Sequence, residues 1–120
     1  MPGSWIAVDL DGTLAEYDGF KGPTVIGAPI PAMLERVQRW HQEGRTVLIF
    51  SSRVSHPDDG EQCREAIERW CAEHLGWTPA VTATKDYRIG EFWDDRAVLV
   101  EANTGRVLAA APTASVARLA

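Results

Sequence analysis

Short apolar runs alternate with two amphipathic stretches along the chain. The runs at 5–8, 46–50, 80–82 and 89–93 have the length of β-strands. The run at 46–50 (TVLIF) is apolar on both faces, which is typical of a parallel strand covered by helices. The stretches that follow Pro31 and Asp58 carry apolar residues at helical spacing and end at Gly44 and Gly76. This alternation of strands and helices predicts an α/β fold.

The remaining segments indicate irregular structure and a hairpin. Residues 10–29 are rich in glycine and proline, which excludes a long helix. The runs 97–101 and 106–109 flank Asn103-Thr104-Gly105, a sequence typical of a β-hairpin turn. The tail at 112–120 is rich in small residues and is expected to be frayed. We therefore predict a three-layer, Rossmann-like fold with a largely parallel central sheet and a C-terminal β-hairpin.

Chain length and composition limit the domain organisation. The 120 residues fit one domain, 1–120, and leave little room for a separate lid. No apolar run approaches the ~20 residues of a membrane span, and the first five residues show no signal peptide. Cys63 and Cys71 have no partner Cys/His cluster for zinc and fit two semi-buried thiols in a reducing cytosol. A cytoplasmic protein with no membrane partner is therefore expected.

Acidic, hydroxyl and basic residues follow the predicted strands directly or within a few positions. In open parallel sheets, ligands bind beyond the carboxyl ends of the strands. The first strand is followed there by Asp9 and Asp11, and Gly12 permits a sharp exit from it. The later strand ends are followed by hydroxyl, basic and acidic groups: Ser51, Ser52, Arg53, Lys85, Asp94 and Asp95.

Each of these groups, taken alone, also has an ordinary interpretation as a turn, a loop or a surface side chain. Adjacent acids such as Asp94 and Asp95 repel each other without a cation, and with Asp9 they could form an oxygen cage for Mg²⁺. Ser51 and its backbone N–H could hold phosphate oxygens, and Lys85 could offset negative charge. Their coincidence at four successive strand ends favours a site for phosphate chemistry.

The string Asp9-Leu10-Asp11-Gly12-Thr13-Leu14 resembles the first motif of the haloacid dehalogenase-like (HAD) superfamily of phosphohydrolases. Ser51 resembles the second motif, Lys85 the third, and Asp94-Asp95 the double-Asp form of the fourth. The resemblance spans about residues 5–101, and its first motif is the most specific. The spacing after Asp95 departs from the family pattern because no helix fits there. The usual fifth strand is therefore expected to be truncated or replaced by the hairpin.

The resemblance implies a Mg²⁺-dependent phosphomonoester hydrolase. Asp9 would attack phosphorus to give an aspartyl-phosphate, and Asp11 would act first as the acid and then as the base. Ser51 would bind a phosphate oxygen, and Lys85 would offset the charge of Asp9 and the phosphate. The metal would be held by oxygen ligands from Asp9, the backbone carbonyl of Asp11, Asp94 and Asp95.

Family members often carry a cap domain, and neither usual insertion site is long enough for one here. The resemblance therefore implies an open site for a phosphorylated substrate that can be large, or a lid borrowed from a neighbouring subunit of a homo-oligomer. The segment 16–23, which we call the flap, would lie beside the site. The candidates for substrate contact are Gly12, Tyr17, Lys21, Ser52 and Arg53.

Other function classes stay open at this stage. An open site would permit a polynucleotide 3′-phosphatase. However, 12 basic and 17 acidic residues give a net charge of −5, which disfavours a nucleic-acid partner without excluding a local groove. A non-catalytic phosphate- or metal-binding module could use the same residues. A receiver-type signalling domain also combines acids, Ser/Thr and Lys, but without the Asp-x-Asp-Gly-Thr form.

Overall fold

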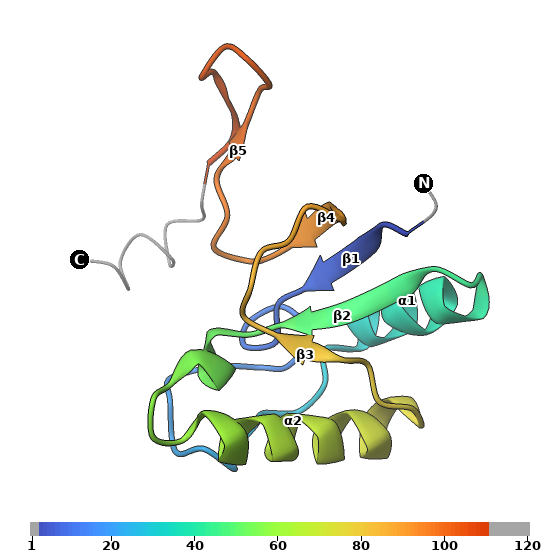
Figure 1. Ribbon diagram of the computed structural model, residues 1–120, viewed down its shortest axis with the longest axis vertical. Coiled ribbons are helices and arrows are strands. Elements are labelled where there is room, and N and C mark those ends of the chain that lie inside the picture. Colours follow the sequence, from blue (N-terminus) through green and yellow to red (C-terminus); the bar gives the residue numbers. More distant parts are fainter. Residues whose placement is uncertain (1–2, 111–120) are drawn as a thin grey trace.

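The computed structural model describes residues 3–110 and contains the alternating elements that the apolar pattern predicts (Figure 1). In chain order they are β1 (Trp5–Val8), α1 (Pro31–Gln42), β2 (Thr46–Phe50), the short 3-10 helix η1 (Ser52–Ser55), α2 (Gly60–Leu75), β3 (Val81–Thr82), β4 (Ile89–Trp93), β5 (Leu99–Val100) and β6 (Val107–Ala109). β1, β2 and β4 have the predicted bounds. The tail expected to be frayed, 112–120, lies outside the described residues.

The main sheet has four parallel strands in the order β3-β2-β1-β4. β1 is paired on both sides and all four of its residues are buried, so the apolar sequence Trp5–Val8 sits at the centre of the sheet. The α/β prediction is confirmed. Because the strands run parallel, their carboxyl ends share one edge, where Asp9, Ser51 and Asp94 directly follow β1, β2 and β4.

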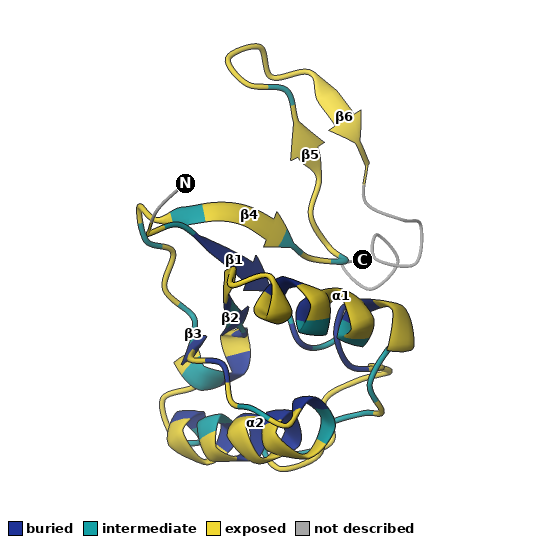
Figure 2. Ribbon diagram, turned by 90° about the vertical axis from the view of Figure 1, so that its right-hand side faces the viewer, coloured by how far each residue is buried: buried dark blue, intermediate teal, exposed yellow. Residues whose placement is uncertain are grey.

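Both helices cover the same face of the sheet (Figures 1 and 2). The chain steps from β1 to β2 to β3 in one direction, and right-handed crossovers then place α1 and α2 on one side. Gln38 of α1 donates from Nε2 to the Leu75 carbonyl at 2.6 Å and accepts from Trp77 Nε1 at 2.8 Å. Apolar side chains from both helices and the strands fill the core, among them Ile6, Val8, Val37, Ile49, Ile67 and Cys71.

The opposite face of the sheet has no helix over it in the described part of the chain. The connection between β3 and β4, residues 83–88, is too short to form a covering helix. Phe92 consequently stays exposed on β4, with its ring edge-on to Phe50 at 6.0 Å. Among residues 3–110, helices therefore cover one face of the sheet only, whereas the three-layer arrangement predicted from the sequence has helices on both faces.

Cys63 and Cys71 lie on the buried stripe of α2 as free thiols. They are more deeply buried than the sequence predicted, with exposed fractions of 1% and 0%. Burial raises the pKa of Cys71 to about 12, which keeps it a thiol at neutral pH. Both cysteines thus contribute to packing.

The C-terminal hairpin is separate from the main sheet. The predicted hairpin is confirmed, because β5 and β6 pair antiparallel with each other. The turn residues Asn103 and Gly105 have positive φ angles of 67° and 79°. Figure 2 shows the hairpin projecting away from the sheet and helices, with exposed residues along both strands. No helix among residues 3–110 is long and apolar enough to cross a membrane.

Candidate functional site

The loop after β1 carries Asp9 and Asp11 at the carboxyl edge of the sheet. The ladder between β1 and β4 extends one residue further, because the Asp9 N–H donates to the Trp93 carbonyl at 2.9 Å. Gly12 then turns the chain with a φ of 90°. A Cβ atom at Gly12 would lie 2.5 Å from a carboxylate oxygen of Asp95. Glycine therefore permits both the turn and the close approach of Asp95.

Thr13 connects this loop with the end of β4. Its hydroxyl oxygen lies 3.3 Å from Asp9 Oδ2 and 3.2 Å from Asp95 Oδ1, and it accepts the Asp95 backbone N–H at 2.9 Å. A hydroxyl has one hydrogen, so it donates to one carboxylate at a time. Thr13 is buried, and it fixes the relative position of two acids that are far apart in sequence.

Asp9, Asp94 and Asp95 form what we call the acidic cluster. One carboxylate oxygen of each lies within 4.8 Å of the others. Burial, followed by the negative charge of Asp94 and the contacts with Asp95, raises the pKa of Asp9 to about 8, against the opposing hydrogen bond from Thr13. Burial and the neighbouring acids thus disfavour the ionised form of Asp9 when no cation is bound.

The donor set of the acidic cluster suits a hard divalent cation. Carboxylate oxygens are the ligands that Mg²⁺ prefers, and it commonly completes its shell with water. Neither histidine nor cysteine belongs to this cluster, so it lacks the softer ligands that favour zinc. A bound cation would also offset the negative charge of Asp94, which together with burial raises the pKa of Asp9. The cluster could therefore hold a metal.

Asp11 points away from the acidic cluster and toward Arg53. Arg53 Nε donates to Asp11 Oδ2 at 2.7 Å and Arg53 Nη2 donates to Asp11 Oδ1 at 3.0 Å, a two-point ion pair. The flap supports Arg53, because the Phe20 ring lies 5.0 Å from the guanidinium and the Gly22 carbonyl accepts from Nη1 at 3.4 Å. Arg53, a candidate for substrate contact in the sequence, is buried and bound to Asp11.

Ser51 and the two acids of the first loop share one hollow, which we call the acidic cavity. Its volume is about 410 Å³, and it is lined by Asp9, Asp11, Tyr17, Phe50, Ser51, Ser52, Asp94 and Arg96. The Ser51 hydroxyl oxygen accepts the backbone N–H of Arg53 at 3.3 Å, which caps η1. This bond uses an acceptor position, so the Ser51 O–H stays available as a donor.

The two lysines lie outside the acidic cavity in this structure. Lys85 is exposed, and its Nζ lies 5.5 Å from the centre of the Phe92 ring. Lys21 pairs with Asp18 at 2.9 Å on the exposed flap. Of the predicted substrate contacts, Tyr17 and Ser52 line the acidic cavity, whereas Gly12 lies against the Asp95 carboxylate.

Sequence reasoning missed three contributions to the site. Thr13 appeared only as part of the first motif, yet it bridges two acids. The pairing of Asp11 with Arg53 joins residues 42 positions apart, for which the sequence carries no periodic signal. Arg96 lines the acidic cavity, and its place directly after the Asp pair was the available hint.

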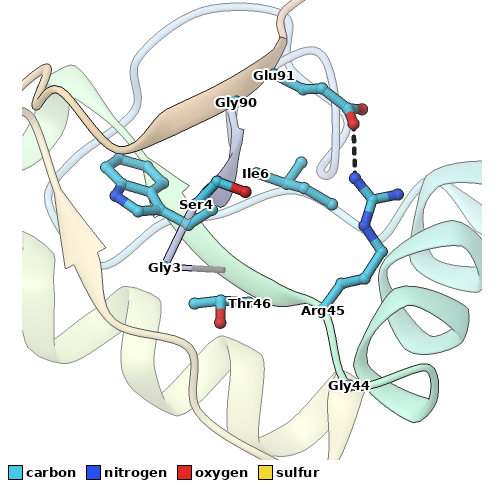
Figure 3. Close-up of a pocket in the computed structure, with 9 residues that line it drawn as sticks. Gly3, Ser4, Ile6, Gly44, Arg45, Thr46, Gly90 and Glu91 are labelled. Atoms are coloured by element: carbon cyan, nitrogen blue, oxygen red, sulfur yellow. Dashed lines mark hydrogen bonds and ion pairs between the residues drawn. The ribbon is translucent and has the colours of Figure 1, made fainter. Parts of the chain in front are cut away.

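Another hollow lies at the opposite, amino-terminal edge of the sheet (Figure 3). Of the side chains that line it, the charged ones are Arg45 and Glu91, which pair at 2.6 Å. Their charges offset each other, and glycines make up much of the remaining wall. The acidic and hydroxyl side chains that could take part in a reaction line the acidic cavity at the carboxyl edge instead.

Comparison with known proteins supports the fold. The chain is similar to a solved structure of a conserved protein from Bacteroides thetaiotaomicron, with 29% sequence identity and a TM-score of 0.53. The match covers 78% of this chain and 76% of that one. No protein-family model matches the chain, and no curated protein matches it. The parallel α/β architecture is thus shared with that protein.

Proposed function

We propose that the chain is a Mg²⁺-dependent phosphomonoester hydrolase of the HAD type that acts through an aspartyl-phosphate on Asp9. The observation that carries the proposal is the meeting of Asp9, Asp11 and Ser51 in the acidic cavity beside Asp94 of the acidic cluster. A nucleophile, a second acid, a hydroxyl donor and a cation site are the parts that phosphoryl transfer requires.

Asp9 is the nucleophile in the proposed reaction. One of its oxygens attacks phosphorus, the bond from phosphorus to the ester oxygen breaks, and Asp11 gives its proton to that leaving oxygen. Water then attacks phosphorus and passes a proton to Asp11, and the bond between phosphorus and Asp9 breaks. Inorganic phosphate leaves, and both carboxyl groups return to their starting state.

The other residues position the reacting groups. Ser51 donates its O–H to a phosphate oxygen, since the bond that it accepts from the Arg53 backbone N–H leaves its hydrogen unused. Arg53 orients Asp11 through both carboxylate oxygens, and each of these oxygens keeps a second lone pair for a proton. Lys85 would have to leave the Phe92 ring to offset charge at Asp9, which its flexible stem permits.

Mg²⁺ fits the acidic cluster by charge and by ligand type. Asp9, Asp94 and Asp95 would hold it, together with the backbone carbonyl of Asp11. When bound, the ion would supply neutralising charge and polarise a phosphate oxygen. Asp9 would then be kept as a carboxylate, the form that attacks phosphorus.

Hydrolysis of a chromogenic phosphate ester in Mg²⁺ tests the proposal. We expect turnover by the wild type, loss of turnover in excess chelator, and a fall of at least about a thousandfold in Asp9→Asn. Asp58→Asn is a matched control, because Asp58 is an exposed acid outside the acidic cluster. Equal turnover by the wild type and Asp9→Asn would refute the assignment.

A further inference from the structure

A second cavity adjoins the acidic cavity under the flap. This flap cavity, of about 410 Å³, is lined by residues that include Asp11, Tyr17, Phe20, Ser52, His56 and Pro57. Asp11, Tyr17 and Ser52 line both cavities, whereas Asp9 and Asp94 line the acidic cavity alone. The two hollows are therefore neighbours with Asp11 at their boundary.

The geometry of phosphoryl transfer indicates which part of a substrate would lie on each side of this boundary. The attacking and leaving oxygens lie roughly in line on opposite sides of phosphorus. In the proposed function, on which this inference rests, Asp9 attacks and Asp11 protonates the leaving oxygen. The leaving group must consequently lie beyond Asp11 on the side away from Asp9, and that side is the flap cavity.

The wall of the flap cavity favours an aromatic group without charge. Tyr17 and Phe20 present aromatic rings, and Phe20 is 54% exposed although it is large and apolar. The cation that lines this cavity, Arg53, is already paired with Asp11 and covered by the Phe20 ring. His56 Nδ1 accepts the backbone N–H groups of Asp58 and Asp59, at 3.2 and 3.0 Å, so this nitrogen is already used within its own loop.

We propose that the flap cavity is the leaving-group subsite and that it takes an uncharged aromatic leaving group. The phosphate occupies the acidic cavity, and the ring of the leaving group lies against Tyr17 and Phe20 of the flap. Substrate selectivity then comes from apolar and aromatic contacts beside Asp11, and a second anionic group on the substrate gains nothing from Arg53.

Calorimetric titration of the full chain in Mg²⁺ with benzylphosphonate and ethylphosphonate tests the subsite without requiring turnover. Both probes carry the same phosphonate, so the ratio of their dissociation constants measures the aromatic contribution. We expect benzylphosphonate to bind at least about tenfold more tightly. Phe20→Ala and Tyr17→Ala should each reduce this ratio, while Tyr87→Ala, an exposed aromatic at the opposite edge of the sheet, should preserve it.

Equal affinities for the two phosphonates in the wild type, binding of neither, or an unchanged ratio in both flap variants would overturn the subsite. Circular dichroism checks that the variants are folded, and the exposure of Phe20 makes unfolding by its truncation unexpected. Hydrolysis of benzyl phosphate and ethyl phosphate is measured in parallel. Selective binding without hydrolysis would refute the proposed function alone, and hydrolysis without selective binding would refute the subsite alone.

Discussion

At the residue scale, the ion pair between Asp11 and Arg53 is the most buried ion pair among the described residues. The Arg53 side chain is 5% exposed and that of Asp11 is 20% exposed, so water screens the pair poorly. Removing one partner of such a pair leaves a buried charge without compensation. The same contact that positions Asp11 therefore also contributes to the stability of the fold.

Arg53→Met is expected to lower the free energy of unfolding by about 3 kcal/mol, because it strands the Asp11 carboxylate. Arg45→Met is the matched control. Its ion pair with Glu91 has a similar length, 2.6 Å, but both side chains are more than two-fifths exposed, and a loss below about 1 kcal/mol is expected. Urea denaturation measures both. Equal losses for the two variants would contradict the central role of the buried pair.

Gly12→Ala is expected to weaken Mg²⁺ binding by at least about tenfold, because the new Cβ would displace the Asp95 carboxylate, a member of the acidic cluster. Gly19→Ala separates this clash from backbone strain. Gly19 also has a positive φ, 127°, but a Cβ there would meet nothing within 4 Å. Calorimetric titration with Mg²⁺ measures both variants, and unchanged affinity in Gly12→Ala would be evidence against the cluster as the metal site.

The raised pKa of Asp9 predicts how metal-free stability varies with pH. The unfolded chain loses the Asp9 proton near pH 4, whereas the folded chain keeps it until about pH 8. Between these values the folded state binds more protons, so the Asp9 contribution to stability falls as pH rises. In excess chelator, the Tm of the wild type relative to Asp9→Asn should therefore fall from pH 5 to pH 8. A relative Tm that rises with pH would contradict this sign.

At the element scale, the sequence predicted β1 and β2 well because burial requires apolar residues in both strands. The runs at 5–8 and 46–50 are apolar throughout their cores, and their ends coincide with β1 and β2. Asp9 and Asp94 were predicted to meet because parallel strands share a carboxyl edge, and their carboxylates do lie together. A position at the end of a buried strand is set by local patterning, so it can be inferred without the fold.

The contacts made by loops were not predictable in the same way. Arg53 was expected to face the substrate, but η1 turns it inward toward Asp11. Lys85 follows β3, yet the six-residue connection to β4 leaves it over Phe92. The direction of a side chain in a loop depends on the local turn and on distant partners, and neither leaves a periodic signal in the sequence. The candidate site was therefore predictable in composition and only partly in geometry.

At the scale of the whole molecule, the projecting hairpin is the feature that fits a monomeric protein least well. Val98, Leu99 and Val100 are consecutive, so apolar side chains occupy both faces of the strand. Together with Val107 and Leu108 they are between 48% and 57% exposed. An isolated two-stranded hairpin is marginally stable in water, and strands that are apolar on both faces are normally covered on both.

A second copy of the chain carries the same apolar hairpin, and a two-fold pair of hairpins would cover one face of each. We therefore expect sedimentation velocity to show a concentration-dependent dimer. The double variant Leu99→Lys/Val107→Lys should shift the equilibrium to the monomer, because it places one charge on each apolar face of the hairpin and so opposes association through either face. Thr104→Lys adds charge at the turn instead and should leave the dimer intact. A wild type that stays monomeric at every concentration, or equal effects of the two changes, would show that the hairpin does not mediate self-association.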